Sequence, residues 1–303
     1  MPDIPAVSVV IATYNRSRFL PETIDSVLGQ KWQDFELIVV DDGSTDDTRQ
    51  VIESYGSKVK YYYQENRGPS AARNLGVRNA SGDWIAIQDS DDLATPDYLA
   101  TLYGYAREHS DCGLVFANGA YLGGPEHSRD TIIPRDKSQR LAREGVRLAD
   151  LFEKSIVRLQ AALIRRSCYD AVGGHDESLR ICMDLDLSFR LFMAYPVSYI
   201  DRVVFLYRKH EGNSGRNEEL RLTENIRVIE KLVAAHPDAR DLLGRSAVDR
   251  RMAYRHYRLA KGRWKRKQFD AARQAIGAAV SLCPYSVKYW FYKVRWSLSG
   301  KQS

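Results

Sequence analysis

The sequence contains no apolar run that approaches the roughly eighteen residues needed for a membrane-spanning helix. Residues 1–6, Met-Pro-Asp-Ile-Pro-Ala, also lack the basic and apolar segments of a secretory signal peptide. We therefore expect a cytoplasmic chain. The few cysteines are irregularly spaced, which argues against a zinc ligand set or a small disulfide framework and predicts reduced thiols at Cys112, Cys168, Cys182 and Cys283.

The commonest phosphate-binding motifs are absent as well. Neither GxGxxG nor GxxxxGK[ST] occurs, so the dinucleotide-binding and P-loop classes lose their main support. The 303 residues are 44% hydrophobic, which is enough to build one large domain with or without a smaller second one. Charge is divided unevenly, because residues 250–303 hold fourteen Lys or Arg against one acid, whereas residues 1–249 carry a net charge of −7.

Short apolar runs alternate with helical patterns through the first half of the chain. The runs are typical of buried parallel strands and cover residues 7–12, 37–40, 59–63, 84–87 and 114–117. This alternation predicts an α/β fold with an open, mostly parallel sheet flanked by helices. In such folds the ligand sites lie beyond the carboxyl ends of the strands, so polar residues at those ends are the candidate site residues.

The segment DSDD, residues 89–92, follows the fourth run and places three carboxylates within four residues. Acids at a strand end commonly cap the next helix, but the Thr-Pro-Asp segment 95–97 already provides a cap, a proline and a first-turn acid. Because side chains alternate along an extended chain, we expect Asp89 and Asp91 to point the same way. Two such carboxylates suit a hard cation, Mg²⁺ or Mn²⁺.

Four motifs in this order, VSVVIATYNR, IVVDDGSTDDT, NRGPSAARNLG and GDWIAIQDSDD, resemble the family 2 glycosyltransferases of the GT-A fold over roughly residues 5–212. The resemblance implies a GT-A domain at 1–215, followed by a basic helical C-terminal region at 216–303. It also implies an inverting, metal-dependent transferase with a nucleotide-sugar donor, expected to be UDP-linked. The acceptor would be a saccharide or a lipid-linked molecule in cell-surface polysaccharide or glycolipid synthesis.

The resemblance assigns donor-binding roles to residues that follow the first two strands. Positions matching Ala12, Thr13, Tyr14 and Asp42 hold the base of the nucleotide in this family. The position matching Arg73 lies near the base and the diphosphate. A cation and an arginine at these places would stabilise the negative charge that develops on the departing nucleoside diphosphate.

The DxD-like segment and a later basic segment would complete the donor site. Asp89 and Ser90 match the part of the motif near the ribose and the metal, and Asp91 matches the acid that ligates the metal bridging the phosphates. The segment LYRKHEGNSGR resembles the part of the family that closes the active site. By that resemblance, Arg208 and His210 would approach the diphosphate or the metal, with His210 as a candidate metal ligand.

A base is also needed to take the proton of the acceptor hydroxyl in an inverting transfer. The segment 173–190 resembles the family's acceptor-side segment, in which a Glu-Asp pair follows a Gly-rich turn. Under this alignment Asp184 is the base, and Met183 stands in place of the usual glutamate. Asp186 is the competing candidate, and both acids could instead be solvated residues near the start of a helix.

Less can be inferred from the remaining segments. Residues 118–158 show no clear periodicity, so we expect a variable loop region over the acceptor site. Residues 220–232 and 250–280 are predicted to be helical, with an interruption at 261–267. The final segment places aromatic side chains at helical spacing on one face: Tyr285, Tyr289, Tyr292 and Trp296.

Three interpretations of this basic, aromatic tail remain open. It could pack as an ordinary helical cap, dock on an anionic membrane surface, or bind nucleic acid. We favour the membrane, which would make the protein peripheral on the inner face, and we expect no nucleic-acid partner because no recognised motif accompanies the charge. For the whole protein, the alternative to an enzyme is a non-catalytic sugar-nucleotide-binding or scaffold protein in which Met183 marks lost chemistry.

Overall fold

A computed structural model of the chain describes residues 4–122, 130–153, 155–212 and 217–298. The chain forms two compact units, Met1–Gly212 and Asn213–Ser303. The boundary expected from the sequence, between Gly215 and Arg216, lies outside the described residues.

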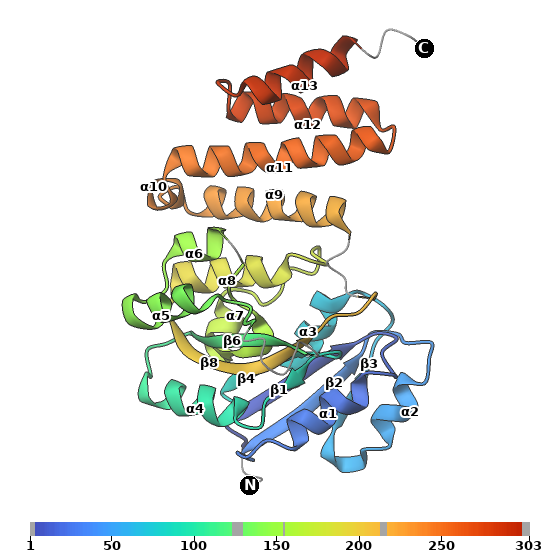
Figure 1. Cartoon of the computed structure of the whole chain (residues 1–303). Helices are drawn as coiled ribbons and strands as arrows, with labels where there is room; N and C mark the ends of the chain where they lie inside the picture. The colour runs from blue at the N-terminus through green and yellow to red at the C-terminus, as the bar shows by residue number, and fades with distance from the viewer. Residues whose placement is uncertain (1–3, 123–129, 154, 213–216, 299–303) are drawn as a thin grey trace. The chain divides into compact units, whose positions relative to one another are not determined.

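The first unit is built on one mixed sheet (Figure 1). Its strands are β1 Val7–Thr13, β2 Phe35–Asp41, β3 Lys60–Tyr63, β4 Trp84–Asp89, β5 Leu93–Ala94, β6 Leu114–Leu122, β7 Ala162–Arg165 and β8 Val197–Arg208. Their order in the sheet is β3-β2-β1-β4-β7-β6-β8-β5. The first four strands in this order are parallel, whereas β7 and β5 run antiparallel to their neighbours. The predicted open α/β sheet is therefore present, with an antiparallel insertion.

Helices cover both faces of this sheet. They are α1 Leu20–Leu28, α2 Thr48–Glu53, α3 Pro69–Arg78, α4 Tyr98–Glu108, α5 Arg135–Glu144, α6 Leu148–Glu153, α7 Arg166–Ala171 and α8 Met183–Ala194. Val9 and Ile11 of β1 belong to the same core cluster as the apolar residues of α1 and α4, whereas Val10 faces α3. Gly76 allows α3 to approach β1 closely, because a Cβ there would lie 2.3 Å from Cγ1 of Val10.

The expectation of loops over residues 118–158 is wrong for much of that segment. It contains the end of β6 together with α5 and α6, and β8 follows later in the chain without having been predicted. The outer face of α5 is strongly charged and its buried side is narrow, with Ser138 and Leu141 as its buried residues. Such a helix depends on tertiary packing, which a search for apolar periodicity does not detect.

The second unit is helical in all of its described elements: α9 Glu218–Ala235, α10 Ala239–Leu243, α11 Arg245–Lys265, α12 Phe269–Leu282 and α13 Val287–Leu298. The break predicted at 261–267 comes later in the structure, because α11 continues to Lys265 and the turn to α12 covers residues 266–268. Tyr289 and Tyr292 of α13 pack on Tyr257, and Trp296 stacks on Trp264 with ring centroids 4.6 Å apart. Most of the predicted aromatic face therefore packs inside the unit.

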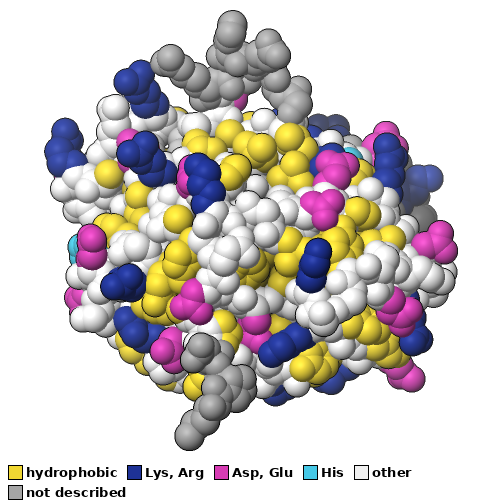
Figure 2. Space-filling model, turned by 90° about the horizontal axis from the view of Figure 1, so that it is seen from below, with side chains coloured by type: hydrophobic (Ala, Val, Ile, Leu, Met, Phe, Trp, Pro, Cys, Tyr) yellow, Lys and Arg dark blue, Asp and Glu magenta, His cyan; other side chains and the backbone are white. Residues whose placement is uncertain are grey.

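No helix among the described residues combines the length and the apolarity needed to cross a bilayer. Seen from below the view of Figure 1, the surface carries Lys and Arg side chains interspersed with Asp and Glu (Figure 2). Mixed charge of this kind is typical of a solvated surface.

Candidate active site

The parallel register of the sheet brings several predicted site residues to one edge. Thr13, at the end of β1, lies opposite Asp41 of β2, and Ala12 lies opposite Asp89 of β4. All these positions are carboxyl ends of parallel strands, where an open α/β sheet places its ligands. The N-terminal part of α3 contributes Arg73 to the same edge.

A cavity of about 200 Å³ opens beside these strand ends. Its lining includes the four residues predicted to hold a nucleotide base, Ala12, Thr13, Tyr14 and Asp42. The Oγ1 atom of Thr13 is buried and has no hydrogen-bond partner among the described residues. An unpartnered buried hydroxyl in a cavity wall is available to a bound ligand.

Asp42 organises the loop that forms the opposite wall of the cavity. Its carboxylate accepts hydrogen bonds from the backbone N–H groups of Arg67 and Gly68, at 2.9 and 2.8 Å, and from the side chain of Gln64. Gly68 has a φ of 94°, and a Cβ at this position would lie 2.9 Å from Nη1 of Arg180. The left-handed backbone therefore favours glycine at this position, whereas the flexible tip of Arg180 could move aside.

Three carboxylates form the centre of the candidate site. Oxygen atoms of Asp89, Asp91 and Asp92 all lie within 4.8 Å of one another. The carboxylates do not converge for the reason expected from the sequence, which was alternation of side chains along a strand. In the structure β4 ends at Asp89 and the next residues form a turn. Asp89 and Asp91 therefore converge through this turn and not through strand alternation, with Ser90 buried between them.

Asp92 is the buried member of this cluster. It is 0% exposed, its Oδ1 accepts a hydrogen bond from the backbone N–H of Arg208, and its Oδ2 has no partner among the described residues. Burial, together with the neighbouring Asp89 carboxylate, raises the pKa of Asp92 to about 8. A divalent cation would satisfy the orphan oxygen and offset the repulsion between the carboxylates, so these residues fit such an ion.

Arg73 connects the acidic cluster to α8. Its guanidinium, which is 5% exposed, lies 2.6 Å from Oδ1 of Asp89 and 2.8 Å from Oδ1 of Asp184. Burial alone would lower the pKa of Arg73, but the two carboxylates outweigh that effect and raise it above the usual range. The arginine is therefore permanently charged and holds the two aspartates in a fixed relation.

The structure places the two candidate bases differently. Asp184 faces the cluster, and burial raises the pKa of this carboxyl, although Arg73 acts in the opposite direction. Asp186 is 2% exposed and is held by Arg190, whose Nε and Nη2 lie 2.9 and 2.5 Å from Oδ2. Asp186 thus forms a buried ion pair within α8.

Met183 is buried against Ser70 of α3.

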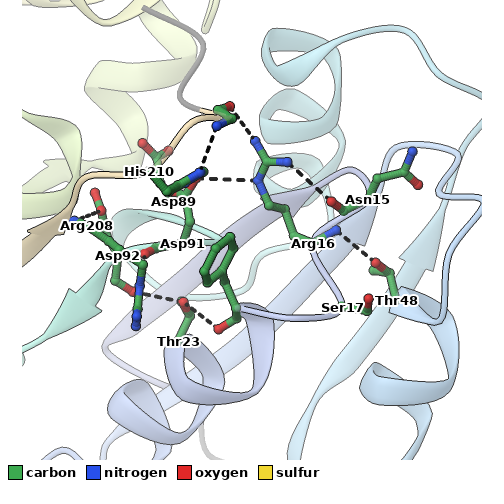
Figure 3. Close-up of polar contacts among 12 residues, drawn as sticks. Asn15, Arg16, Ser17, Thr23, Thr48, Asp89, Asp91, Asp92, Arg208 and His210 are labelled. Carbon is green, nitrogen blue, oxygen red and sulfur yellow. Dashed lines mark hydrogen bonds and ion pairs between the residues drawn. The ribbon is translucent and has the colours of Figure 1, made fainter.

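His210 lies against Asp91, and the two side chains point toward each other in Figure 3. Nε2 of His210 is 2.9 Å from Oδ2 of Asp91, while the backbone N–H of Gly212 donates to Nδ1. A neutral ring that accepts at Nδ1 carries its proton on Nε2, so His210 donates to Asp91. Arg16 approaches the same carboxylate oxygen at 3.4 Å and also donates to the carbonyl of Gly212.

Arg208 supports the turn that carries the acids. Its Nε donates to the backbone carbonyl of Asp91 at 3.0 Å, and its Nη2 lies 2.7 Å from a carboxylate oxygen of Glu22. Its backbone N–H reaches Asp92. These contacts fix the position of the acidic turn relative to α1, which carries Glu22.

Several residues at this site were not predicted. Asp92 could have been included as the third acid of DSDD, and Arg16 closes the TYNR segment, but neither position has a spacing that reveals its role. Gln160, in the short 3₁₀ turn Leu159–Ala161, donates to the carboxylate of Asp89. It lies far from Asp89 in sequence, so no local pattern could have indicated this contact.

Comparison with known proteins decides the family. The sequence model of the family described as Glycosyl transferase family 2 matches residues 8–173. The chain belongs to this family. It is also 37% identical over 229 residues to glycosyltransferase GlyG of Streptococcus pneumoniae, an alignment that covers 70% of this chain and 73% of GlyG.

Other sequence relatives of this family 2 chain are longer than the region they share with it. An uncharacterized glycosyltransferase of Rickettsia typhi is 30% identical over 214 residues, which cover 69% of this chain and 66% of that protein. For three further rickettsial relatives the shared region is between 31% and 37% of their length. The chain thus spans less than two thirds of these relatives.

Solved structures show the same fold. Staphylococcus aureus TarS 1–349 in complex with UDP-GlcNAc superposes with a TM-score of 0.70 at 21% identity, over 91% of this chain and 81% of the 1–349 chain. The mannosyltransferase PcManGT of Pyrobaculum calidifontis, in complex with GDP-Man and Mn²⁺, gives a TM-score of 0.62 at 18% identity, over 98% of this chain and 85% of PcManGT. The sheet and its flanking helices are of the GT-A type predicted from the four motifs.

Proposed function

We propose that this chain transfers a sugar from a nucleotide-sugar donor to the hydroxyl of a saccharide or lipid-linked acceptor, with inversion at the anomeric carbon. One observation carries the proposal: Arg73 joins Asp184 to Asp89 of the acidic cluster, beside the cavity at the strand ends. A base and a diphosphate site are the two parts that such a transfer needs within one sugar's width of each other.

The donor would occupy the cavity and the acidic turn. The base would lie against Thr13 and the loop held by Asp42, and the diphosphate would extend toward Asp89 and Asp91. Bound UDP-GlcNAc in TarS and bound GDP-Man with Mn²⁺ in PcManGT support a nucleotide sugar as the donor class, and we expect a UDP-sugar.

Metal dependence is part of the proposal. Asp91, Asp89 and Asp92 would hold Mn²⁺ or Mg²⁺, which when bound neutralises the charge of the diphosphate leaving group. His210 would orient the Asp91 carboxylate by its Nε2–H bond, and Arg16 would add positive charge at the same oxygen. These contacts favour a positioning role for His210 over direct ligation.

Asp184 would act as the general base. Its Oδ1 is held by Arg73, and no hydrogen bond to its Oδ2 is present among the described residues, so Oδ2 is the atom that can take a proton. The acceptor oxygen would bond to the anomeric carbon as its proton passes to Asp184, while the bond from that carbon to the diphosphate breaks. Burial makes the carboxylate a stronger base than a solvated aspartate, which favours proton transfer.

The setting proposed for this reaction is the synthesis of a cell-surface polysaccharide or glycolipid, with the enzyme on the cytoplasmic side of the membrane. The competing function is a non-catalytic protein that binds nucleotide sugars, which the methionine at position 183 would favour. The two differ in whether Asp184 is needed for turnover.

Replacing Asp184 with Asn tests the proposal directly. The Asp184→Asn variant should lose about 10³-fold in transfer rate, because an amide cannot take the proton. Donor-induced thermal stabilisation, measured with UDP-sugars and GDP-mannose in the presence of Mn²⁺, should be largely retained. Asp186→Asn is the matched control, since it makes the same change at the other acid in the first turn of the same helix.

An undiminished transfer rate in Asp184→Asn would refute the assignment of the base. A wild-type protein that binds nucleotide sugars but turns over no acceptor would favour the non-catalytic alternative. A larger loss of rate in Asp186→Asn than in Asp184→Asn, with both variants folded, would move the role of base to Asp186.

A further inference from the structure

The terminal helix α13 has two apolar faces on opposite sides. One face, formed by Tyr289, Tyr292 and Trp296, packs on the aromatic residues of α11. Figure 1 shows α13 lying along α12 at the end of the second unit. The opposite face consists of large apolar side chains that are between 43% and 83% exposed: Val287, Trp290, Phe291, Val294 and Leu298. We call these five residues the α13 stripe.

The spacing of the α13 stripe makes it continuous. Positions 287, 291, 294 and 298 follow one another at intervals of four, three and four residues, which aligns them on one side of a helix, and Trp290 borders them. Elsewhere in the second unit the described large apolar side chains that are exposed are separated along the chain, at Leu242, Tyr254, Phe269 and Tyr285. Single exposed apolar residues are ordinary, whereas a row of five along one helix marks a binding surface.

The α13 stripe is bordered by positive charge and by no negative charge. Lys288 and Arg295 lie on one side of it and Lys293 on the other, as the helical spacing requires. The ammonium of Lys293 lies 4.9 Å from the ring centroid of Trp290. Asp270 is the last acid of the sequence, so no carboxylate follows it on α12, on α13 or after them.

We propose that the α13 stripe docks on an anionic lipid surface, with the helix lying in the plane of the headgroups. An apolar face with cationic borders complements a layer in which anionic headgroups surround an apolar interior. Trp290 and Phe291 are residue types that settle at the headgroup level. A second copy of the stripe is a poorer partner, because it would bring two sets of cations together.

This docking is independent of the transfer reaction, since no residue of the α13 stripe belongs to the candidate active site. It also reassigns the face of the tail that contacts the membrane. The pattern at 285, 289, 292 and 296 pointed to one side of the helix, but three of those four residues are the packed ones.

Vesicle flotation of the full chain tests the proposal. The wild-type protein should float with vesicles of phosphatidylcholine mixed with phosphatidylglycerol and much less with phosphatidylcholine alone. The triple substitution Phe291→Gln, Val294→Gln and Leu298→Gln should lower the partition coefficient at least tenfold, since it removes the apolar contact while keeping good helix formers. Lys293→Gln should lower it about fivefold, the effect of one cation near an anionic surface.

Matched controls come from the same unit. Leu242→Gln removes an exposed apolar side chain outside the stripe, and Lys267→Gln removes an exposed cation from the α11–α12 turn. Neither should change flotation. Circular dichroism and donor-induced thermal shift on the triple variant establish that it is folded and that its first unit still binds ligand.

Two results would overturn the proposal. One is equal flotation of the wild type and the folded triple variant on the mixed vesicles, including the case in which neither floats. The other is a stable oligomer of the wild type, detected by light scattering, that the triple substitution dissociates, because a second copy would then cover the stripe. Failure of the proposed transfer reaction would leave both measurements unaffected.

Discussion

The two ends of the parallel strands each hold an acidic side chain, but its pKa is lowered at one end and raised at the other. At the amino end, Glu36 of β2 receives hydrogen bonds from Lys60, Ser8 and Ser81. Burial works to raise its pKa, but these bonds outweigh burial and lower the pKa of Glu36 to about 2. At the carboxyl end, Asp92 keeps one oxygen unpartnered and has a pKa raised to about 8.

The difference separates an acid that stabilises the fold from one that is held ready for a ligand. Glu36 is fully satisfied by the protein, so its charge contributes to stability at neutral pH. Asp92 lies in a cluster with two other carboxylates, an arrangement that costs stability and that the proposed cation would relieve. Proteins commonly accept such a cost at the site of function.

The largest expected effect is at the carboxyl end. Asp91→Asn should lower the transfer rate about 10²-fold or more, because it removes a charge from the proposed cation site. It should also weaken the Mn²⁺-dependent rise in melting temperature. Asp111→Asn, which changes an exposed acid away from the sheet ends, is the control. Full activity of Asp91→Asn without added metal would contradict the proposal that transfer needs a cation held by Asp91.

At the amino end the effect should be on stability alone. Glu36→Gln should lower the free energy of unfolding by about 2 kcal/mol at neutral pH, because the charge-assisted bonds to Lys60 and the two serines are weakened. A lowered pKa means that the stabilisation is present above the ordinary pKa of 4.5 and is lost as the pH falls toward 2.

Urea unfolding at about pH 7 and about pH 3 checks this window, and the difference between wild type and variant should shrink at the lower pH. Glu108→Gln, at an exposed position in the last turn of α4, should leave the free energy of unfolding unchanged. Transfer activity at neutral pH should be the same in both variants. A loss of activity in Glu36→Gln without a loss of stability would contradict a purely structural role for Glu36.

The opposite sign is expected for Asp92. Without metal, Asp92→Asn should raise the free energy of unfolding by about 1 kcal/mol at neutral pH, since it removes a buried carboxylate with a raised pKa. For such a group the folded state binds the proton more tightly, so wild-type stability falls as the pH rises from about 4 toward 8. Urea unfolding with a chelator should show this slope in the wild type and not in the variant. A destabilised Asp92→Asn would mean that the charge is compensated without a cation.

The smallest effect concerns Arg158, an exposed residue just before the turn that carries Gln160. Its positive charge acts to lower the pKa of Asp184, against the effect of burial. Arg158→Gln should therefore shift the rising limb of the pH–rate profile to slightly higher pH and leave the plateau unchanged. Arg166→Gln, on α7, is the control, and an identical shift in both variants would indicate a general change of charge.

The sequence predicted well which residues meet at the carboxyl edge of the sheet, because the motifs that contain them are local. Thr13, Asp42 and Asp89 each follow an apolar strand, and parallel pairing brings strand ends together without further information. The sequence was less informative where contacts join distant segments. Gln160 contacts Asp89, and Arg16 contacts Asp91. The members of each pair lie far apart in the sequence, so no local spacing predicts these contacts.

The tail shows the same limit in another form. Both faces of α13 are apolar, so periodicity alone cannot say which one is buried. The choice depends on which side of α13 faces Tyr257 and Trp264 of α11. The covered face is the one whose rings, at Tyr289, Tyr292 and Trp296, contact the aromatic side chains of α11.

The sequence by itself determined the family, the open and mostly parallel sheet, and the charged residues at the strand ends, because each of these follows from short motifs and local periodicity. Tertiary structure alone decided that Asp92 joins Asp89 and Asp91 in the acidic cluster, that Arg73 ties Asp184 to Asp89, and that α13 turns one apolar face outward. The physical reason is that burial and charge pairing depend on neighbours brought together by the fold, and those neighbours lie far apart along the chain.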